Sequence, residues 1–430
     1  MAAKLGIVSQ MDLAQAIRAR TSKALGIVLW ILTELAIMAT DIAEVIGAAI
    51  ALYLLFDIPL IIAVFITVFD VLLLLLLTKV GFRKIEAIVV CLIFVILFVF
   101  VYQVALSNPD WGGVFKGLIP TSETFAKHPV VHDMSPLNGA LGIIGATVMP
   151  HNLYLHSAIS QTRKFDRNNE DDIANAVRFT AWDSNIQLGL AFVVNSLLLI
   201  MGVAVFKSGA VEDPSFFGLY QALSDTSVMS NGLLAAAART GILSTLFAVA
   251  LLASGQNSTI TGTLTGQVIM EGFIHLRMPL WARRLITRLL SVIPVLICVA
   301  LTSGKSTIEE HEALNNLMNN SQVFLAFALP FSMLPLVIMT GSKVEMGERF
   351  KNRLWINILG WISVISLTYL NMIGLPQNLE PFFPADKVGL AHTVAYILIV
   401  LIIALLIWTL VELYLGNKRF AAEQAKKHNK

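Results

Sequence analysis

Long apolar segments recur along almost the whole chain, and short polar stretches separate them. Ten of these segments are long enough to cross a hydrocarbon core about 30 Å thick. They cover residues 25–55, 58–78, 85–107, 137–159, 180–206, 240–270, 286–303, 313–338, 354–375 and 389–415. The pattern predicts an all-α, polytopic membrane protein with about ten transmembrane helices.

The composition supports this class. Of the 430 residues, 57% are hydrophobic and 13% are charged, and the mean hydropathy is +0.76. The net charge of +2 does not indicate nucleic-acid binding, because basic residues of a membrane protein chiefly set its topology. Cys91 and Cys298 lie in apolar segments, so buried thiols are expected rather than a disulfide framework or a zinc site.

Lysine and arginine alternate between successive loops. The basic residues gather in 4–23, 79–84, 163–178, 277–284, 343–353 and 418–427, whereas the intervening loops carry acids such as Asp110, Glu123 and Glu380. Because basic loops stay in the cytoplasm, both termini of this chain are expected there, in a multi-pass protein of the plasma membrane. The two longest loops, near 108–136 and 207–238, are expected outside, and no cleavable signal pattern opens the chain.

One apolar segment contains a glycine- and proline-bearing interruption, GIIGATVMPHNLYLH, from Gly142 to His156. Pro150 removes a backbone donor and clashes with the preceding turn, and we expect the two glycines before it to loosen that turn. The helix should therefore break between Ala146 and Asn152. Freed carbonyls at membrane depth persist only where protein, water or an ion satisfies them, so the break is a candidate binding site.

The residues at this break suggest a metal. Met149 offers a thioether, Ala146 offers a freed carbonyl, and His151 and His156 offer imidazoles. A thioether is a soft, uncharged ligand that suits manganese, iron and later transition metals better than magnesium or calcium. The alternatives are a methionine that only packs, a proline that only kinks the helix and a histidine that is a satisfied core residue.

Three acids lie in the first apolar segment. Glu34, Asp41 and Glu44 are spaced by seven and three residues and share one helical face. Acids at membrane depth by default indicate an ion or proton pathway. The alternative is a structural ion pair with an arginine, which does not exclude proton transfer. Arg288 begins a later segment at a depth where it could pair with these acids, although it could also extend to the membrane surface.

Two further segments carry polar residues. Ser254, Gln256, Ser258, Thr259, Thr261, Thr263 and Gln267 crowd residues 251–273, where close helix packing is a better explanation than metal binding. Gln322 offers an uncharged oxygen ahead of Pro330.

Together these segments resemble the Nramp family of proton-coupled divalent-metal transporters, in its bacterial manganese-transporting branch. GATVMPHNLYLHSA resembles the family's broken sixth helix, ATDIAEVIGAAIAL its third helix, and GQNSTITGTLTGQVIMEGF its transport motif. The resemblance covers nearly the whole chain. It implies a LeuT-like fold of two inverted repeats, with the substrate at broken helices near the membrane midplane.

The resemblance also assigns roles. It implies metal binding by Met149, Ala146 and, in some states, Gln322. It implies a proton pathway through His151, Glu34, Asp41, Glu44 and Arg288, with Arg284 as an alternative to the last. The implied function is proton-coupled import of manganese and iron, without enzymatic activity or a resident cofactor. The partners are metal ions, protons and the lipid bilayer, with neither nucleic acid nor an obligate protein partner.

One family motif is missing. The family's first helix supplies an Asp-Pro-Gly-Asn sequence to the metal site, and these 430 residues do not contain it. The ten segments, within 25–415, then correspond to the family's helices three to twelve, residues 1–24 to the cytoplasmic end of the second helix and a loop, and 416–430 to a cytoplasmic tail. We therefore expect a single, N-terminally truncated transmembrane domain over 1–430.

The missing carboxylate leads to an expectation about activity. With one thioether, one carbonyl and water, a divalent cation lacks local negative charge, so the chain as written should not transport. Three alternative functions would leave different marks on the sequence or on transport. An amino-acid symporter of the same fold would not need Met149 or His151, an intramembrane metallopeptidase would need an HExxH sequence that does not occur, and a passive channel would conduct without saturation.

Overall fold

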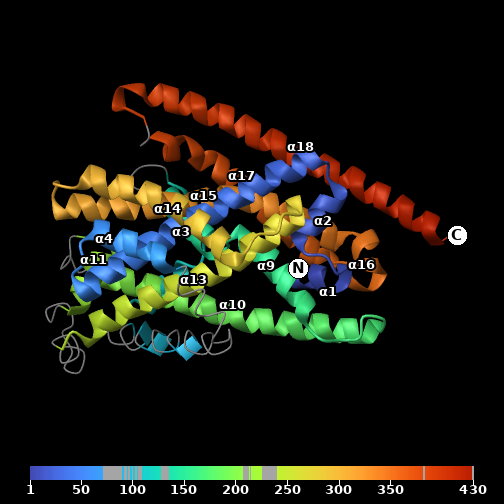
Figure 1. Cartoon of the computed structure of the whole chain (residues 1–430), viewed down its shortest axis with the longest axis horizontal. Helices are drawn as coiled ribbons and strands as arrows, with labels where there is room; N and C mark the ends of the chain where they lie inside the picture. Colours follow the sequence, from blue (N-terminus) through green and yellow to red (C-terminus); the bar gives the residue numbers. More distant parts are fainter. Residues whose placement is uncertain are drawn as a thin grey trace.

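The computed structural model describes residues 1–70, 90–91, 94, 97–98, 100–101, 104, 109–126, 135–206, 213, 215–224, 240–380 and 383–428. Within these ranges the secondary structure is helical, and the long helices run side by side along one axis (Figure 1). The α-helices are α1 (Ala2–Ser9), α2 (Leu13–Arg20), α3 (Lys23–Phe56), α4 (Leu60–Ile66), α7 (Trp111–Lys116), α8 (Pro136–Thr147), α9 (Pro150–Ile159), α10 (Glu170–Phe206), α11 (Phe216–Ser224), α13 (Ile242–Ile274), α14 (Leu280–Thr302), α15 (Thr307–Gly341), α16 (Lys343–Phe350), α17 (Leu354–Leu379) and α18 (Val388–His428).

In the described part of the chain, six helices are long and apolar enough to cross a membrane. They are α3, α10, α14, α15, α17 and α18, and each contains one of the predicted segments. Segment 137–159 forms the pair α8 and α9, and 240–270 lies in α13. Only the start of 58–78 is described, as α4 and a 3-10 turn, Thr67–Phe69. Most of 85–107, and much of the loops 108–136 and 207–238, lies outside the described residues.

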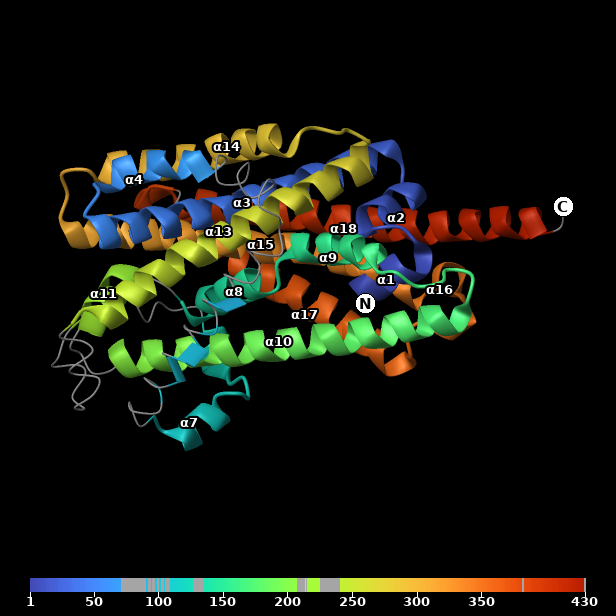
Figure 2. The ribbon, with the colours of Figure 1, turned by 60° about the horizontal axis from the view of Figure 1, so that its bottom comes forward.

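Helix α3 lies at the centre of the bundle. Helix α13 packs along it, with α14 on one side and α15 on the other (Figure 2). Small residues near its C-terminal end, Gly47, Ala48 and Ala51, are buried and let neighbouring helices approach closely. The acids of α3 are therefore inside the protein rather than facing lipid.

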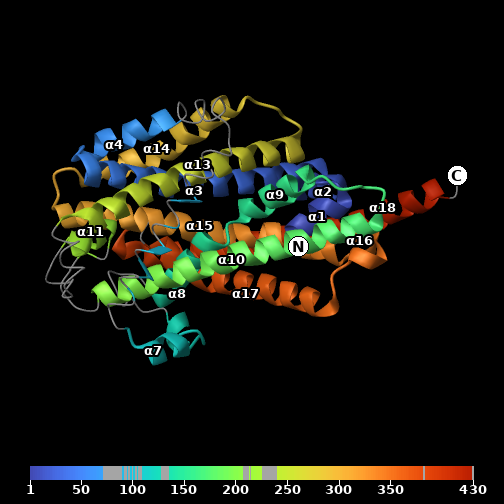
Figure 3. The same cartoon turned by 90° about the horizontal axis from the view of Figure 1, so that it is seen from below.

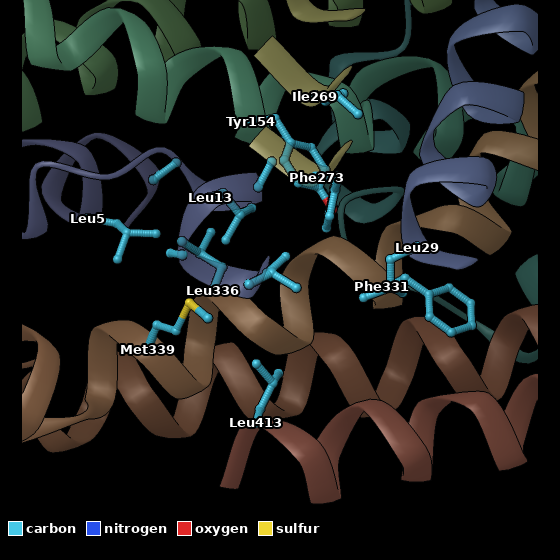
Figure 4. Close-up of a cluster of buried hydrophobic side chains, with 14 of the residues drawn as sticks. Leu5, Leu13, Leu29, Tyr154, Ile269, Phe273, Phe331, Leu336, Met339 and Leu413 are labelled. Carbon is cyan, nitrogen blue, oxygen red and sulfur yellow. The ribbon is translucent and has the colours of Figure 1, made fainter. Parts of the chain in front are cut away.

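A cluster of buried hydrophobic side chains joins the short helices α1 and α2 to the bundle (Figure 4). Leu5, Leu13 and Met339 of α15 are fully buried there, and Leu29 of α3 is almost fully buried. Burying each such side chain from water is worth about 1.5–3 kcal/mol. The cluster includes Leu413 of α18, so it ties both ends of the chain together.

Both cysteines are free. Cys298 is half-buried, but Cys91 is exposed in the structure, so the expectation of two buried thiols is wrong for Cys91.

Candidate metal and proton site

The predicted helix break is present. Helix α8 ends at Thr147 and α9 begins at Pro150, and between them Val148 (φ −107°, ψ 72°) and Met149 (φ −70°, ψ 127°) leave the helical conformation. Pro150 is the first residue of α9, where its missing N–H costs nothing. Because Pro150 cannot donate to the carbonyl of Ala146, that carbonyl lacks its helical partner.

Gly142 and Gly145 serve a different purpose from the one expected. Both lie in the regular part of α8, and they do not loosen its last turn. A Cβ on Gly145 would collide with the backbone oxygen of Gln322, and one on Gly142 would lie 2.5 Å from Oδ1 of Asn319. The glycines thus let α8 lie directly against α15 (Figure 3), which brings Gln322 beside the break.

Three residues with metal-binding atoms lie on the helices that form this contact. Ala146, Met149 and Gln322 are each half-buried. The side-chain nitrogen of Gln322 donates to Ser321 Oγ at 3.0 Å, so its amide oxygen is the atom left to face a ligand. The structure places the helix break and Gln322 on helices in direct contact, and a metal site made of a sulfur and two oxygens there stays a prediction.

The two histidines of α9 have different surroundings. His151 is 2% exposed, and its Nδ1 has no hydrogen-bond partner in the described part of the chain. Its helix, α9, contacts α3, the helix that carries Asp41. His156 is exposed and lies 3.0 Å from Ser184 Oγ of α10. The two imidazoles therefore do not form the paired arrangement that a metallopeptidase needs.

The acids of α3 pair with consecutive arginines at the start of α14. Arg283 lies 2.5 Å from Glu34, and Arg284 lies 2.5 Å from Asp41 and 3.2 Å from Glu44. Arg284, Asp41 and Glu44 are all buried. The shared face predicted from the spacing is therefore confirmed, and the arginine partners come from one neighbouring helix.

Asp70 is a buried acid that the sequence analysis did not single out. It follows the 3-10 turn after α4 and is 7% exposed. Arg288 Nε donates to Asp70 Oδ2 at 2.8 Å, and Arg284 Nη2 donates to the same oxygen at 2.9 Å. The available signal was a single aspartate inside the apolar segment 58–78.

Arg288 therefore has a different main partner from the one expected. Its nearest acid is Asp70, whereas its Nη1 lies 3.9 Å from Glu44 and 3.4 Å from the carbonyl of Asp41. Arg284, held as the alternative, makes the direct contacts to the acids of α3. The physical reason is helical position, because Arg284 precedes Arg288 by one turn and faces Asp41 across the α3–α14 contact.

Thr259 of α13 completes the network. Its hydroxyl donates to Glu44 Oε2 at 2.9 Å and accepts from Arg284 Nη2 at 2.7 Å. Around it, the carboxyls of Asp41, Glu44 and Asp70 face the guanidiniums of Arg284 and Arg288. Three acids with two arginines leave one negative charge if all are ionised, and an unbalanced buried charge is costly. Uptake of one proton would therefore bring the network to charge balance.

Comparison with known proteins identifies the relatives of this chain. A family model described as "Natural resistance-associated macrophage protein-like" (Nramp) matches residues 1–377. A "Divalent metal cation transporter MntH" of Levilactobacillus brevis is 56% identical over 372 residues, covering 86% of this chain and 77% of the relative. The protein of the same description from Pediococcus pentosaceus is 55% identical over 379 residues, covering 88% of this chain and 81% of the relative.

The crystal structure of the Eremococcus coleocola manganese transporter, in complex with an aromatic bis-isothiourea substituted compound, is similar throughout. It is 65% identical, with a TM-score of 0.88, and the match covers 98% of this chain and 85% of that one. A second structure of that transporter, the mutant H236A, matches with a TM-score of 0.88 at 64% identity. The likeness confirms the predicted fold class, an all-α, multi-pass transporter of the LeuT-like kind.

Proposed function

Because the chain belongs to the Nramp family of membrane transporters, we propose that it imports divalent transition metal ions, manganese foremost and iron as well. Import is coupled to protons and proceeds by alternating access. The metal ion is the substrate, and no resident cofactor is required. The relatives named as divalent metal cation transporters support divalent metal ions as the substrate. Such proteins are transporters and not enzymes.

The observation that carries this proposal is the interrupted helix pair α8 and α9 against α15. It offers the sulfur of Met149, the carbonyl of Ala146 and the amide oxygen of Gln322 at one place inside an apolar bundle. A thioether adds little affinity for hard ions such as calcium and magnesium, and suits softer transition metals. An amino-acid symporter of the same fold would gain nothing from that sulfur.

The buried acid network supports the proton part of the proposal. His151 lies two residues after Met149 on α9, which contacts α3, and Asp41 of α3 connects through Arg284 to Glu44 and Asp70. Glu34 lies two turns closer to the start of α3, paired with Arg283. A proton received at His151 or the Asp41 cluster can pass along these groups towards the cytoplasmic end.

The proposed function also includes an orientation in the membrane. The alternation of basic loops supports a plasma-membrane location with both ends of this chain in the cytoplasm.

Substituting Met149 tests the substrate assignment. In cells making the protein as its own gene encodes it, we expect saturable manganese uptake that cadmium inhibits and calcium does not. Met149→Ala should let calcium compete, because the soft ligand that disfavours calcium is gone. Competition is measured as inhibition of radioactive manganese uptake by each cation.

Met333→Ala is the matched control, since Met333 packs in an apolar cluster of α15 and should leave the inhibition pattern unchanged. Unaltered discrimination in Met149→Ala would remove the thioether from the selectivity argument. Uptake without any acidification of the cell interior would contradict proton coupling, and non-saturating conductance would favour a channel.

The expectation that these 430 residues alone do not transport remains a prediction. The same assay, on cells that make only this polypeptide, tests it. Manganese uptake at normal protein levels would show it to be wrong.

A further inference from the structure

Helix α15 contains two internal prolines, Pro330 and Pro335, and the first lies about one turn after Ala326, which borders the α8 contact. Pro330 has no N–H, so the carbonyl of Ala326, four residues earlier, loses its partner in the helix. In a membrane interior a freed carbonyl must find another donor, because no bulk water is present. Ala326 is fully buried, so this donor must come from a neighbouring helix.

Asn371 of α17 supplies the donor. Its Nδ2 lies 2.6 Å from the carbonyl oxygen of Ala326, and its side chain is fully buried. The Oδ1 of the same amide has no hydrogen-bond partner among the residues that the structure describes. Leaving Oδ1 buried without a donor costs free energy. The hydrogen bond from Nδ2 to Ala326 is the favourable interaction of this side chain that offsets the cost.

The two halves of α15 pack against different neighbours. Before Ala326, Val323 packs with Leu137 and Leu141 of α8. After Pro330, Leu336 and Met339 join the cluster of α1, α2 and α18 shown in Figure 4. The stretch 326–330 therefore lies between a half that packs against α8 and a half that packs in the cluster with α1, α2 and α18.

Helix α17 runs along both halves. Val364 packs with Leu334 and Val337 on the cytoplasmic side of Pro330, while Leu370 and Ile373 pack beside Val323 on the other side. Asn371 lies within the second group, between Leu370 and Ile373, and its amide reaches the carbonyl that lacks a helical partner. A single neighbouring helix thus contacts α15 on both sides of Pro330 and supplies a donor where the backbone of α15 lacks one.

We propose that residues 326–330 form a hinge in α15 and that Asn371 is the positioning residue of this hinge. The amide of Asn371 replaces the backbone bond that Pro330 cannot make, so the half of α15 that carries Gln322 can tilt while the other half stays fixed. The inference rests on the proposed function in one respect: the tilt moves Gln322 relative to Met149 and Ala146 during transport.

A double-mutant cycle tests this hinge in the protein as its gene encodes it. The variants are Asn371→Ala, Pro330→Ala and the two combined. For each, the unfolding temperature is measured in detergent without metal, and KM and kcat are measured for manganese uptake. Alanine at 330 restores the backbone donor to the carbonyl of Ala326, so the amide of Asn371 becomes dispensable.

We expect Asn371→Ala to lower the unfolding temperature and to reduce kcat by about tenfold, the size expected for one unsatisfied buried carbonyl. In the Pro330→Ala background the same substitution should have little effect. Pro330→Ala alone should keep the unfolding temperature and lower kcat with KM unchanged, because a continuous helix is stiffer. The space left by the alanine at 371 is the same in both backgrounds, so the cycle separates the hydrogen bond from packing.

Asn378→Ala is the control, since Asn378 lies on the same helix and its Nδ2 has no partner in the described part of the chain. Its effect should be the same in both backgrounds. If Asn371→Ala is equally harmful with and without Pro330, Asn371 only packs and the inference is wrong. Normal turnover of Pro330→Ala would also exclude the hinge. If the parent protein takes up no manganese, the proposed function fails, whereas the unfolding temperatures still decide whether Asn371 replaces the missing bond.

Discussion

Asp12 illustrates, at the scale of a single residue, how burial changes a charge. It caps α2, accepting the N–H of Gln15 at 2.9 Å, while the side chain of Gln15 accepts the N–H of Asp12. Gly272 of α13 lies against it, and Asp12 is 5% exposed. Burial raises the pKa of Asp12 to about 6, and the nearby charge of Glu271 adds to the rise, although hydrogen bonds from the backbone oppose it. An ionised Asp12 therefore costs the folded state free energy at neutral pH.

Asp12→Asn should make the protein more stable at neutral pH. A pKa raised from 3.8 means that the favourable contribution of Asp12 is complete below pH 3.8 and is lost as the pH rises through about 6. Asparagine keeps the capping oxygen and removes the charge. We expect a gain of about 2 kcal/mol in the free energy of unfolding near pH 8, shrinking towards zero as the pH approaches about 4.

Denaturant unfolding in detergent across this pH range measures the difference. Asp12→Ala, which removes the cap as well, is the comparison and should gain less at every pH. A gain for Asp12→Asn that does not vary with pH would contradict the argument.

At the scale of helices, the contact between α8 and α15 determines where the candidate metal ligands meet. Gly145 allows this contact, because its position leaves no room for a side chain against the backbone of Gln322. A backbone carbonyl cannot rotate away as a side chain can. Any larger residue must therefore push α8 away from α15.

Gly145→Ala should destabilise the protein by about 1–3 kcal/mol and raise KM for manganese uptake, because it displaces Gln322 from the break. Gly189→Ala on α10 is the matched control. A Cβ there meets nothing within 4 Å, so this change should be neutral or stabilising by up to about 1 kcal/mol, the helix propensity difference. Thermal unfolding and manganese uptake measure both variants. Equal behaviour of the two alanine variants would show that the α8–α15 contact does not limit the site.

At the scale of the whole molecule, polar contacts join the first helices to the last. Arg20 of α2 forms a buried ion pair with Glu345 of α16, and its guanidinium lies 4.2 Å from the centre of the Phe420 ring. Glu412 of α18 accepts hydrogen bonds from the N–H and the hydroxyl of Ser22, at 2.5 and 2.8 Å. The part of α18 around Glu412 is thereby fixed to the segment that leads into α3, while the C-terminal end of α18 extends beyond the bundle (Figure 1).

Glu345→Leu should destabilise the protein by about 3 kcal/mol, because it leaves the guanidinium of Arg20 buried without its carboxylate. Adding Arg20→Met should restore most of that loss, since a buried apolar pair of similar volume avoids the cost of burying charges. Thermal unfolding of the two variants and the parent measures the recovery. A double variant as unstable as Glu345→Leu would show that Arg20 contributes mainly through Phe420 and its other contacts.

Several elements were predictable because their causes are local. The break at Val148 and Met149 follows from Pro150, and the shared face of Glu34, Asp41 and Glu44 follows from helical spacing. The partners were less predictable. Arg284 makes the close ion pair with Asp41, whereas the nearest acid to Arg288 is Asp70, because pairs between helices depend on how far one helix is displaced along another.

The sequence by itself determined the membrane-spanning segments, the interrupted helix and the chemical types of the candidate ligands. Bilayer thickness and backbone hydrogen bonding act on each stretch of chain separately, and their effects can be read residue by residue. Only the tertiary structure decided that Gly145 brings Gln322 to the break, that Asp70 shares the arginines, and that Asn371 meets Ala326. These contacts join residues far apart in the chain, and helix rotation and axial position, which no periodicity specifies, determine them.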